Sequence, residues 1–117
     1  MTLLAEKIKW QFAISETEVP ENGGICVKIE NLQIAIFNFK RRNEWYATQN
    51  LCPHKMQMVL ARGMIGDTNG TPKVACPFHK KTFSLTTGEC LSDNECESIK
   101  TYPVKIENGK IFIGINQ

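Results

Sequence analysis

Two short clusters of metal-binding side chains constrain this chain more than any other feature of its sequence. The first is Cys52-Pro53-His54 and the second is Cys76-Pro77-Phe78-His79, so each cluster pairs one cysteine with one histidine. Thiolate and imidazole groups are ligands for iron and zinc. The proline after each cysteine fixes a backbone φ angle and stiffens the loop. If the clusters hold one metal centre, the fold must bring two loops to the same place.

Length and composition indicate an ordinary globular protein. The chain has 117 residues, of which 42% are hydrophobic and 22% are charged, so we expect one domain covering residues 1–117. The net charge of +2 is too small to indicate a nucleic acid or an anionic membrane as partner. No stretch approaches the roughly 18 apolar residues that cross a membrane, and no signal peptide is recognisable. We therefore expect a cytoplasmic protein without a membrane partner.

Five cysteines in a cytoplasmic chain favour metal ligands or free thiols over a disulfide framework. Cys52 and Cys76 have histidine neighbours. Cys26 lies in an apolar run, which predicts a buried strand residue. Cys90 and Cys96 are close enough in sequence for a bridge, but the expected compartment favours free thiols at both positions.

The two ends of the chain have the period-2 alternation of β-strands, and no stretch has a convincing helical period. An Asn108-Gly109 pair between two apolar runs predicts a β-hairpin, since both residue types accept positive φ. We expect the aromatic residues Trp10, Phe37, Trp45 and Phe112 in the core. Strands are expected at residues 9–14, 25–29, 33–39, 45–48, 101–106 and 110–115.

The middle of the chain differs from its ends. Between residues 50 and 91 the apolar runs become short, and glycines and turn residues are frequent. Both ligand clusters lie in this stretch, and a short strand at residues 73–75 leads directly into Cys76. We interpret residues 50–91, approximately, as a small subdomain inserted into a larger antiparallel β framework.

The order C-P-H followed by C-P-F-H resembles the ligand motif of Rieske iron–sulfur proteins. The resemblance implies an all-β fold, a Rieske-like antiparallel sandwich or barrel with a small cluster-binding subdomain. It also implies a 2Fe–2S cluster. Cys52 and Cys76 would hold one iron of that cluster, and His54 and His79 would hold the other.

Two alternatives to a Rieske cluster remain at this point. Two cysteines and two histidines suit a single structural zinc ion, although zinc fingers usually present their ligands as like pairs and here each pair is mixed. The four residues can also be unrelated to any metal. We find no Ser/His/Asp set, paired carboxylates or phosphate-binding loop, so no catalytic residue is assigned. Both histidines of the chain belong to the ligand clusters.

Beyond the ligands, the chain resembles the small subunit of assimilatory NAD(P)H nitrite reductase, which reduces nitrite to ammonium. The sequences Leu60-Ala61-Arg62-Gly63 and Thr87-Gly88-Glu89-Cys90-Leu91 favour this branch among Rieske proteins. The resemblance implies a partner, the large catalytic subunit, that carries FAD, sirohaem and a further iron–sulfur cluster. This chain would relay electrons or support that subunit. The stretches that carry the likeness are 52–55, 59–67, 72–80, 83–91 and 102–106.

Two other functions are compatible with the same motif. One is a separate Rieske ferredoxin that serves an aromatic-ring dioxygenase, and the other is a structural subunit with an empty or zinc-filled site. High-potential Rieske proteins carry hydroxyl side chains where this chain has Lys81 and Phe83, which implies a low reduction potential near about −150 mV. Lys55, Lys80 and Lys81 are expected at the cluster tip, either as a docking surface for an acidic partner or as a solvated loop edge.

Overall fold

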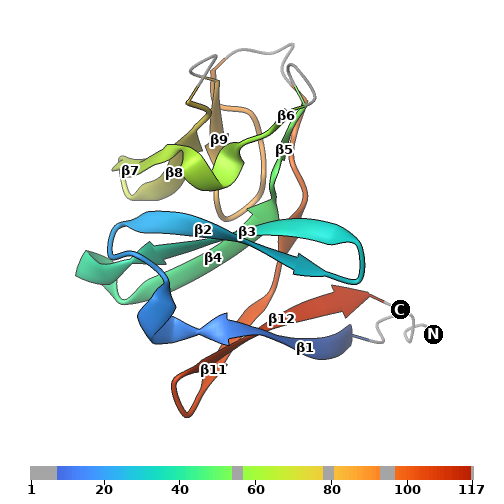
Figure 1. The fold of residues 1–117 in the computed structure, drawn as a ribbon. Coiled ribbons are helices and arrows are strands. Elements are labelled where there is room, and N and C mark those ends of the chain that lie inside the picture. Colours follow the sequence, from blue (N-terminus) through green and yellow to red (C-terminus); the bar gives the residue numbers. More distant parts are fainter. Residues whose placement is uncertain (1–7, 54–56, 78–80, 93–96, 117) are drawn as a thin grey trace, which may run out of the picture.

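The computed structural model describes residues 8–53, 57–77, 81–92 and 97–116. The regular structure of these residues consists of antiparallel β-strands and short 3₁₀ helices, which confirms the expected all-β class. Figure 1 shows three levels: a lower sheet, a middle sheet and an upper part made of two small sheets. No helix in the described residues has the length and apolar character to cross a membrane.

The lower sheet joins the two ends of the described chain in the order β1-β12-β11. Asn108 and Gly109 connect β11 to β12 with φ values of 52° and 76°, which confirms the predicted hairpin. A short helix, η2, follows β1. The bounds are β1 Ile8–Ser15, η2 Glu16–Glu18, β11 Val104–Glu107 and β12 Lys110–Asn116.

The middle sheet has the order β10-β4-β3-β2. The stretch 101–106, expected as one strand, is divided at Pro103 between two sheets. Tyr102 pairs with Ala47 of the middle sheet, whereas Val104 pairs with Ile113 of the lower sheet. Because proline has no N–H group to donate, it suits the point where the chain changes sheets. The bounds are β2 Gly23–Ile29, β3 Leu32–Phe39, η3 Lys40–Arg42, β4 Glu44–Gln49 and β10 Thr101–Tyr102.

The upper part consists of the hairpin β5-β6 and the three-stranded sheet β7-β8-β9 (Figure 1). Its strands have two to five residues each. A single helical turn, η4, connects the hairpin to the sheet and packs on β2 and β3. The bounds are β5 Leu51–Cys52, β6 Gln57–Met58, η4 Leu60–Arg62, β7 Met64–Thr68, β8 Thr71–Ala75 and β9 Thr82–Ser84.

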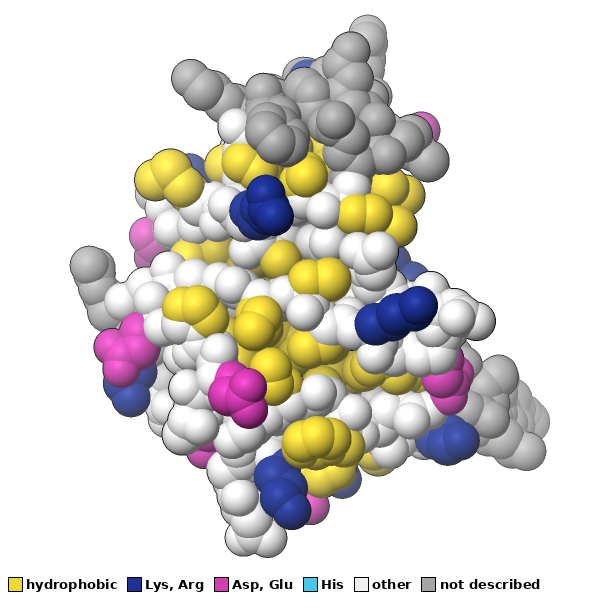
Figure 2. All heavy atoms as spheres, viewed as in Figure 1, with side chains coloured by type: hydrophobic (Ala, Val, Ile, Leu, Met, Phe, Trp, Pro, Cys, Tyr) yellow, Lys and Arg dark blue, Asp and Glu magenta, His cyan; other side chains and the backbone are white. Residues whose placement is uncertain are grey.

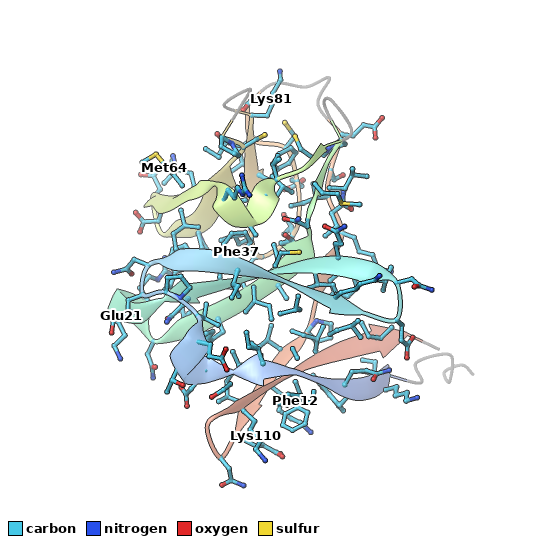
Figure 3. All side chains as sticks on the ribbon, in the orientation of Figure 1. Phe12, Glu21, Phe37, Met64, Lys81 and Lys110 are labelled. Carbon is cyan, nitrogen blue, oxygen red and sulfur yellow. The ribbon has the colours of Figure 1, made fainter. Side chains whose placement is uncertain are left out.

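Strand β3 separates two hydrophobic cores because both of its faces are buried. Ile34 and Ile36 belong to the lower core, between the middle and lower sheets, while Phe37 and Phe39 belong to the upper core. Phe37 is completely inaccessible to solvent, as predicted, and lies between the middle sheet and the upper part (Figure 3). The upper part is therefore anchored on the side chains of one central strand.

The prediction that Trp10 lies in the core is wrong, since this side chain is 38% exposed. A register irregularity between Phe12 and Ile14 lets Ile14 turn into the lower core while Trp10 and Phe12 stay on the outer side of the sheet. Isoleucines of β12 fill the inner side instead. Trp45 is half-buried and packs against the lower core, as predicted. The prediction that Phe112 lies in the core is wrong, since this half-buried side chain pairs with Phe12 on the outer side of the sheet.

Candidate metal centre

The first ligand cluster begins at the end of β5. Cys52 is completely buried and pairs with Gln57 of β6, while Leu51 pairs with Met58. The loop between the paired strands contains His54, which lies outside the described residues. The hairpin therefore places Cys52 at the end of a strand, where the chain begins the ligand loop.

Asn50 closes the base of this loop, a function that we did not predict from the sequence. Its side chain is 3% exposed, and its Oδ1 accepts a hydrogen bond of 2.7 Å from the Ala61 N–H. Its carbonyl accepts the Leu60 N–H at 3.0 Å, and its own N–H donates to the Gln33 carbonyl at 3.0 Å. Asn50 thus ties both ends of the first ligand loop to β3.

The second ligand cluster follows β8 in a similar arrangement. Cys76 is 1% exposed, and its N–H donates a 2.8 Å hydrogen bond to the carbonyl of Lys81. Ala75 pairs with Thr82 just before the loop, so β8 and β9 form its base. His79, the second predicted imidazole ligand, lies outside the described residues. Each cysteine therefore begins a loop whose two ends are held by backbone pairing.

A turn at residues 84–88 follows β9, the strand that closes the second ligand loop. The Ser84 side chain is buried, and its Oγ accepts hydrogen bonds from the Thr86 and Thr87 N–H groups, both at 3.2 Å. Gly88 has a φ of +84°, and a Cβ atom at this position would lie 2.0 Å from the Ile99 carbonyl oxygen. The glycine of the Thr-Gly-Glu stretch is thus required by backbone conformation and by close contact.

The two cysteines belong to the same buried cluster, the upper core, although they lie on different hairpins. Neither is in a disulfide. Two sulfur donors that reach one dry region from two strand ends suit the thiolate half of a 2Fe–2S cluster. The described residues contain no convergent group of three or more histidine, cysteine or acidic side chains, and both histidines lie outside them.

Lysine and methionine side chains lie on the surface of the upper part. Figure 3 shows Lys81 at the top of the upper part, and Met64 at its side. Met58 and Met64 are 49% and 79% exposed, so neither is packed in the interior of the upper part. Lys55 and Lys80, the other lysines expected at this end, lie outside the described residues.

The other cysteines differ from their predictions. Cys26 lies in a strand, as expected, but is exposed, because β2 is the edge of the middle sheet. Partial burial nevertheless raises the pKa of the Cys26 thiol. Cys90, expected as a free thiol, is disulfide-bonded. Cys90 forms a β-bridge with Phe83, which holds it in place next to β9, and Cys96 lies outside the described residues.

Comparison with known proteins finds the same domain family by sequence and by structure. The model of the Rieske-like [2Fe-2S] domain matches residues 9–114. The chain is 35% identical to the nitrite reductase [NAD(P)H] large subunit of Klebsiella oxytoca over 108 residues, which are 92% of this chain and 11% of that protein. It is also 35% identical to the ferredoxin component of the naphthalene 1,2-dioxygenase system of Pseudomonas aeruginosa, over 92% of this chain and 97% of that protein.

Among solved structures, the nitrite reductase [NAD(P)H] small subunit of Erwinia carotovora superimposes with a TM-score of 0.77 at 30% identity. The superposition covers 92% of this chain and 82% of that one. By contrast, the chain spans about a tenth of the length of the long curated nitrite reductases that it matches. Fold, buried cysteines and sequence similarity lead to one conclusion: the chain belongs to the family of Rieske-like [2Fe–2S] domains.

Proposed function

We propose that this chain is the small subunit of a cytoplasmic NAD(P)H-dependent nitrite reductase, in which it relays electrons or supports the large subunit. The observation that carries the proposal is the superposition on a nitrite reductase small subunit over 92% of this chain. The likeness to a segment of the Klebsiella oxytoca large subunit supports the same assignment. The protein is then one component of an oxidoreductase and has no substrate site of its own.

The proposed ligands are Cys52 and Cys76 for one iron and His54 and His79 for the other. When bound, a 2Fe–2S cluster supplies a one-electron carrier, and its two neutral imidazole ligands raise the reduction potential above that of an all-cysteine cluster. The burial of both cysteines in the upper core supports the sulfur half of this ligand set. We propose one domain over residues 1–117, with a cluster-binding subdomain at approximately 50–91.

The described residues supply shielding and orientation around the cysteines. Leu60, Phe83 and Leu85 are buried in the same core as both sulfur atoms, which keeps water away from that side of the site. Phe83 has no hydroxyl group to donate a hydrogen bond toward a cluster, in contrast to the high-potential members of the family. We therefore propose a reduction potential near the lower end of the Rieske range, about −150 mV.

The proposed partner is the large catalytic subunit. By the family resemblance, that subunit carries FAD, sirohaem and a further iron–sulfur cluster, and it holds the site at which nitrite is reduced. A small subunit with a low potential suits electron exchange with flavin and NAD(P)H. Lys81 lies at the end of the molecule where the ligand loops begin (Figure 3), and its positive charge suits an acidic surface of that subunit.

The test of the metal centre is electron paramagnetic resonance of the dithionite-reduced protein together with metal analysis. We expect iron and sulfide, and a rhombic signal with a low average g value. His54→Ala and His79→Ala should each abolish that signal. Cys26→Ser is the matched control, since it replaces an exposed cysteine outside the ligand clusters. Zinc in place of iron, or a signal that survives either histidine substitution, would contradict the ligand assignment.

A dioxygenase ferredoxin is the second candidate function, because the chain is 35% identical to such a ferredoxin over 97% of that protein's length. The two functions differ in their partner. A nitrite reductase subunit should copurify with a large flavin- and sirohaem-containing protein and should increase its NAD(P)H-dependent nitrite reduction. A ferredoxin should instead remain separate and sustain turnover by an aromatic-ring dioxygenase. Copurification followed by both activity assays distinguishes them.

A further inference from the structure

The outer face of the lower sheet, on the side away from the middle sheet, has an apolar centre. Directly opposed residues in an antiparallel pair share one face, and side chains alternate along each strand. The inner positions of β12 hold buried isoleucines. The outer positions of β1 hold Ile8, Trp10 and Phe12, which are 41%, 38% and 55% exposed. Phe112 of β12 lies opposite Phe12.

These side chains form one continuous surface. The rings of Phe12 and Phe112 are edge-to-face with centroids 6.0 Å apart. A Cβ atom on Gly114 would lie 2.8 Å from Ile8 Cγ2 and 2.9 Å from Pro103 Cγ, so these two side chains close over the glycine. In Figure 2, which views the sheets from the side, a hydrophobic group is visible at the lower end of the molecule with charged side chains beside it. Contiguous exposed apolar surfaces of this kind are characteristic of interaction sites.

The charges on this face favour a different protein over a second copy of the chain. The Lys105 Nζ lies 4.8 Å from the centroid of the Trp10 ring. Lys110 lies two residues before Phe112 on β12, on the same face of the sheet. Glu107 is paired with Lys105 at 3.7 Å, which leaves the face with a surplus of positive charge. Two copies joined through this face would bring lysines together. A partner with an apolar patch and carboxylates around it would be complementary.

The position of this face agrees with a permanent contact. Figure 3 places Phe12 and Lys110 at the opposite end of the molecule from Lys81, which marks the end where the ligand loops begin. A large subunit that holds the chain by the lower sheet would leave the loop end, with Lys81, for a second contact at the redox centre of that same subunit. In the long nitrite reductases, the matching region is about a tenth of the polypeptide, so a domain of this kind accompanies a much larger body.

We propose that the outer face of the lower sheet, formed by Ile8, Trp10, Phe12 and Phe112, is the surface on which the large subunit of nitrite reductase docks. The proposal rests on the function proposed above. Its chemistry is an apolar centre with a cation, Lys105, stacked on Trp10, facing an apolar and acidic patch of the large subunit. A ferredoxin that diffuses between partners would not need a second contact surface remote from its cluster.

The test measures binding of the full chain to the separately purified large subunit of the source organism by isothermal titration calorimetry. Phe12→Ser and Trp10→Ser should each weaken binding by about tenfold or more, since aromatic anchors dominate interface energies. Met64→Ser is the matched control, because it removes an exposed apolar side chain from the upper part. Far-UV circular dichroism and the melting temperature verify that each variant is folded.

Each result of this experiment decides the proposal. Unchanged affinity of folded Phe12→Ser would overturn it, and so would a loss of affinity in Met64→Ser alone, which would move the interface to the upper part. A wild-type dimer that Phe12→Ser converts to a monomer would show that the occupant is a second copy. If the wild-type chain fails to bind the large subunit at all, the proposed function itself fails, and the docking surface fails with it.

Discussion

The lower and middle sheets and the upper part of this molecule are built by different means. In the two sheets, strands such as β1 and β3 have eight residues each, and long apolar side chains interlock between them. In the upper part, β5 and β6 have two residues each. Its shape depends on hydrogen bonds of loops and polar side chains, such as those of Asn50 and Ser84. Hydrophobic alternation thus specifies the frame, and polar groups specify the site.

Strand β3 connects the two regions and provides the strongest test of this difference. Phe37→Ala should destabilise the chain by about 3–5 kcal/mol, because the ring is completely buried. Ile36→Ala, on the opposite face of the same strand, should cost about 2–5 kcal/mol. Denaturant unfolding measures both values. Only Phe37→Ala should also lower the iron bound per folded chain, since only Phe37 belongs to the core that contains the cysteines.

Iron content is measured in the absence of denaturant, at a temperature where both variants are fully folded. Equal losses of iron in the Ile36 and Phe37 variants would show that the two cores do not act separately. The distinction between frame and site would then be wrong, since a cavity on either face of β3 would disturb the metal centre equally.

The frame was largely predictable from the sequence. The alternating apolar runs predict β1 to β4 and β12, and the Asn108-Gly109 pair predicts the last hairpin, because these patterns depend on neighbouring residues alone. What the pattern could not show is which face points inward. The register irregularity after Phe12 reverses the faces within β1. Trp10, which follows the same alternation as Ile14, therefore lies outside the core.

From the sequence, the candidate site could be proposed only through its two cysteine–histidine pairs, and the assignment of the ligands stays a prediction. The cysteine–histidine pairs are recognisable because their spacing in the sequence is short. Asn50 escaped notice because its partners, Gln33 and Ala61, are distant in sequence. An asparagine directly before a ligand strand is a weak signal, since this residue type is common in loops. The disulfide of Cys90 was missed because the prediction relied on the expected compartment.

Buried polar bonds in the upper part should contribute more than exposed polar bonds in the frame. Asn50→Leu leaves the Ala61 N–H without its acceptor in a buried place and should cost about 1–3 kcal/mol. Gln11→Leu is the matched control, since it removes an amide that donates to Glu30 at the surface of the lower part. This control should cost less than about 0.5 kcal/mol.

Both variants are compared by denaturant unfolding and by the spectrum of the iron-loaded protein. A shifted spectrum in Asn50→Leu, with the Gln11→Leu spectrum unchanged, is the expected result. If Gln11→Leu destabilises the chain as much as Asn50→Leu, polar groups matter equally in both regions. The contrast between frame and site would then apply to strand length only.

The smallest expected effect lies at the boundary between the two regions. Tyr46 Oη donates a 2.6 Å hydrogen bond to Glu44, and Arg42 contacts both Glu44 at 3.1 Å and Asp67 of β7 at 3.6 Å. Burial, followed by the hydrogen bond and negative charge of Glu44, raises the Tyr46 pKa to about 12 from 10. The protonated Tyr46 hydroxyl therefore makes its full contribution to the free energy of unfolding below pH 10, and this contribution is lost as the pH rises toward 12.

Tyr46→Phe should accordingly change the free energy of unfolding by less than about 1 kcal/mol at pH 8 and should reduce its decline between pH 10 and 12. Denaturant unfolding at pH 8, 10 and 11.5 measures this difference. Tyr102→Phe is the control, because burial alone raises the pKa of Tyr102 and no carboxylate takes part. If Tyr46→Phe keeps the full alkaline decline while Tyr102→Phe abolishes it, Tyr102 and not Tyr46 is the group that lowers stability at high pH.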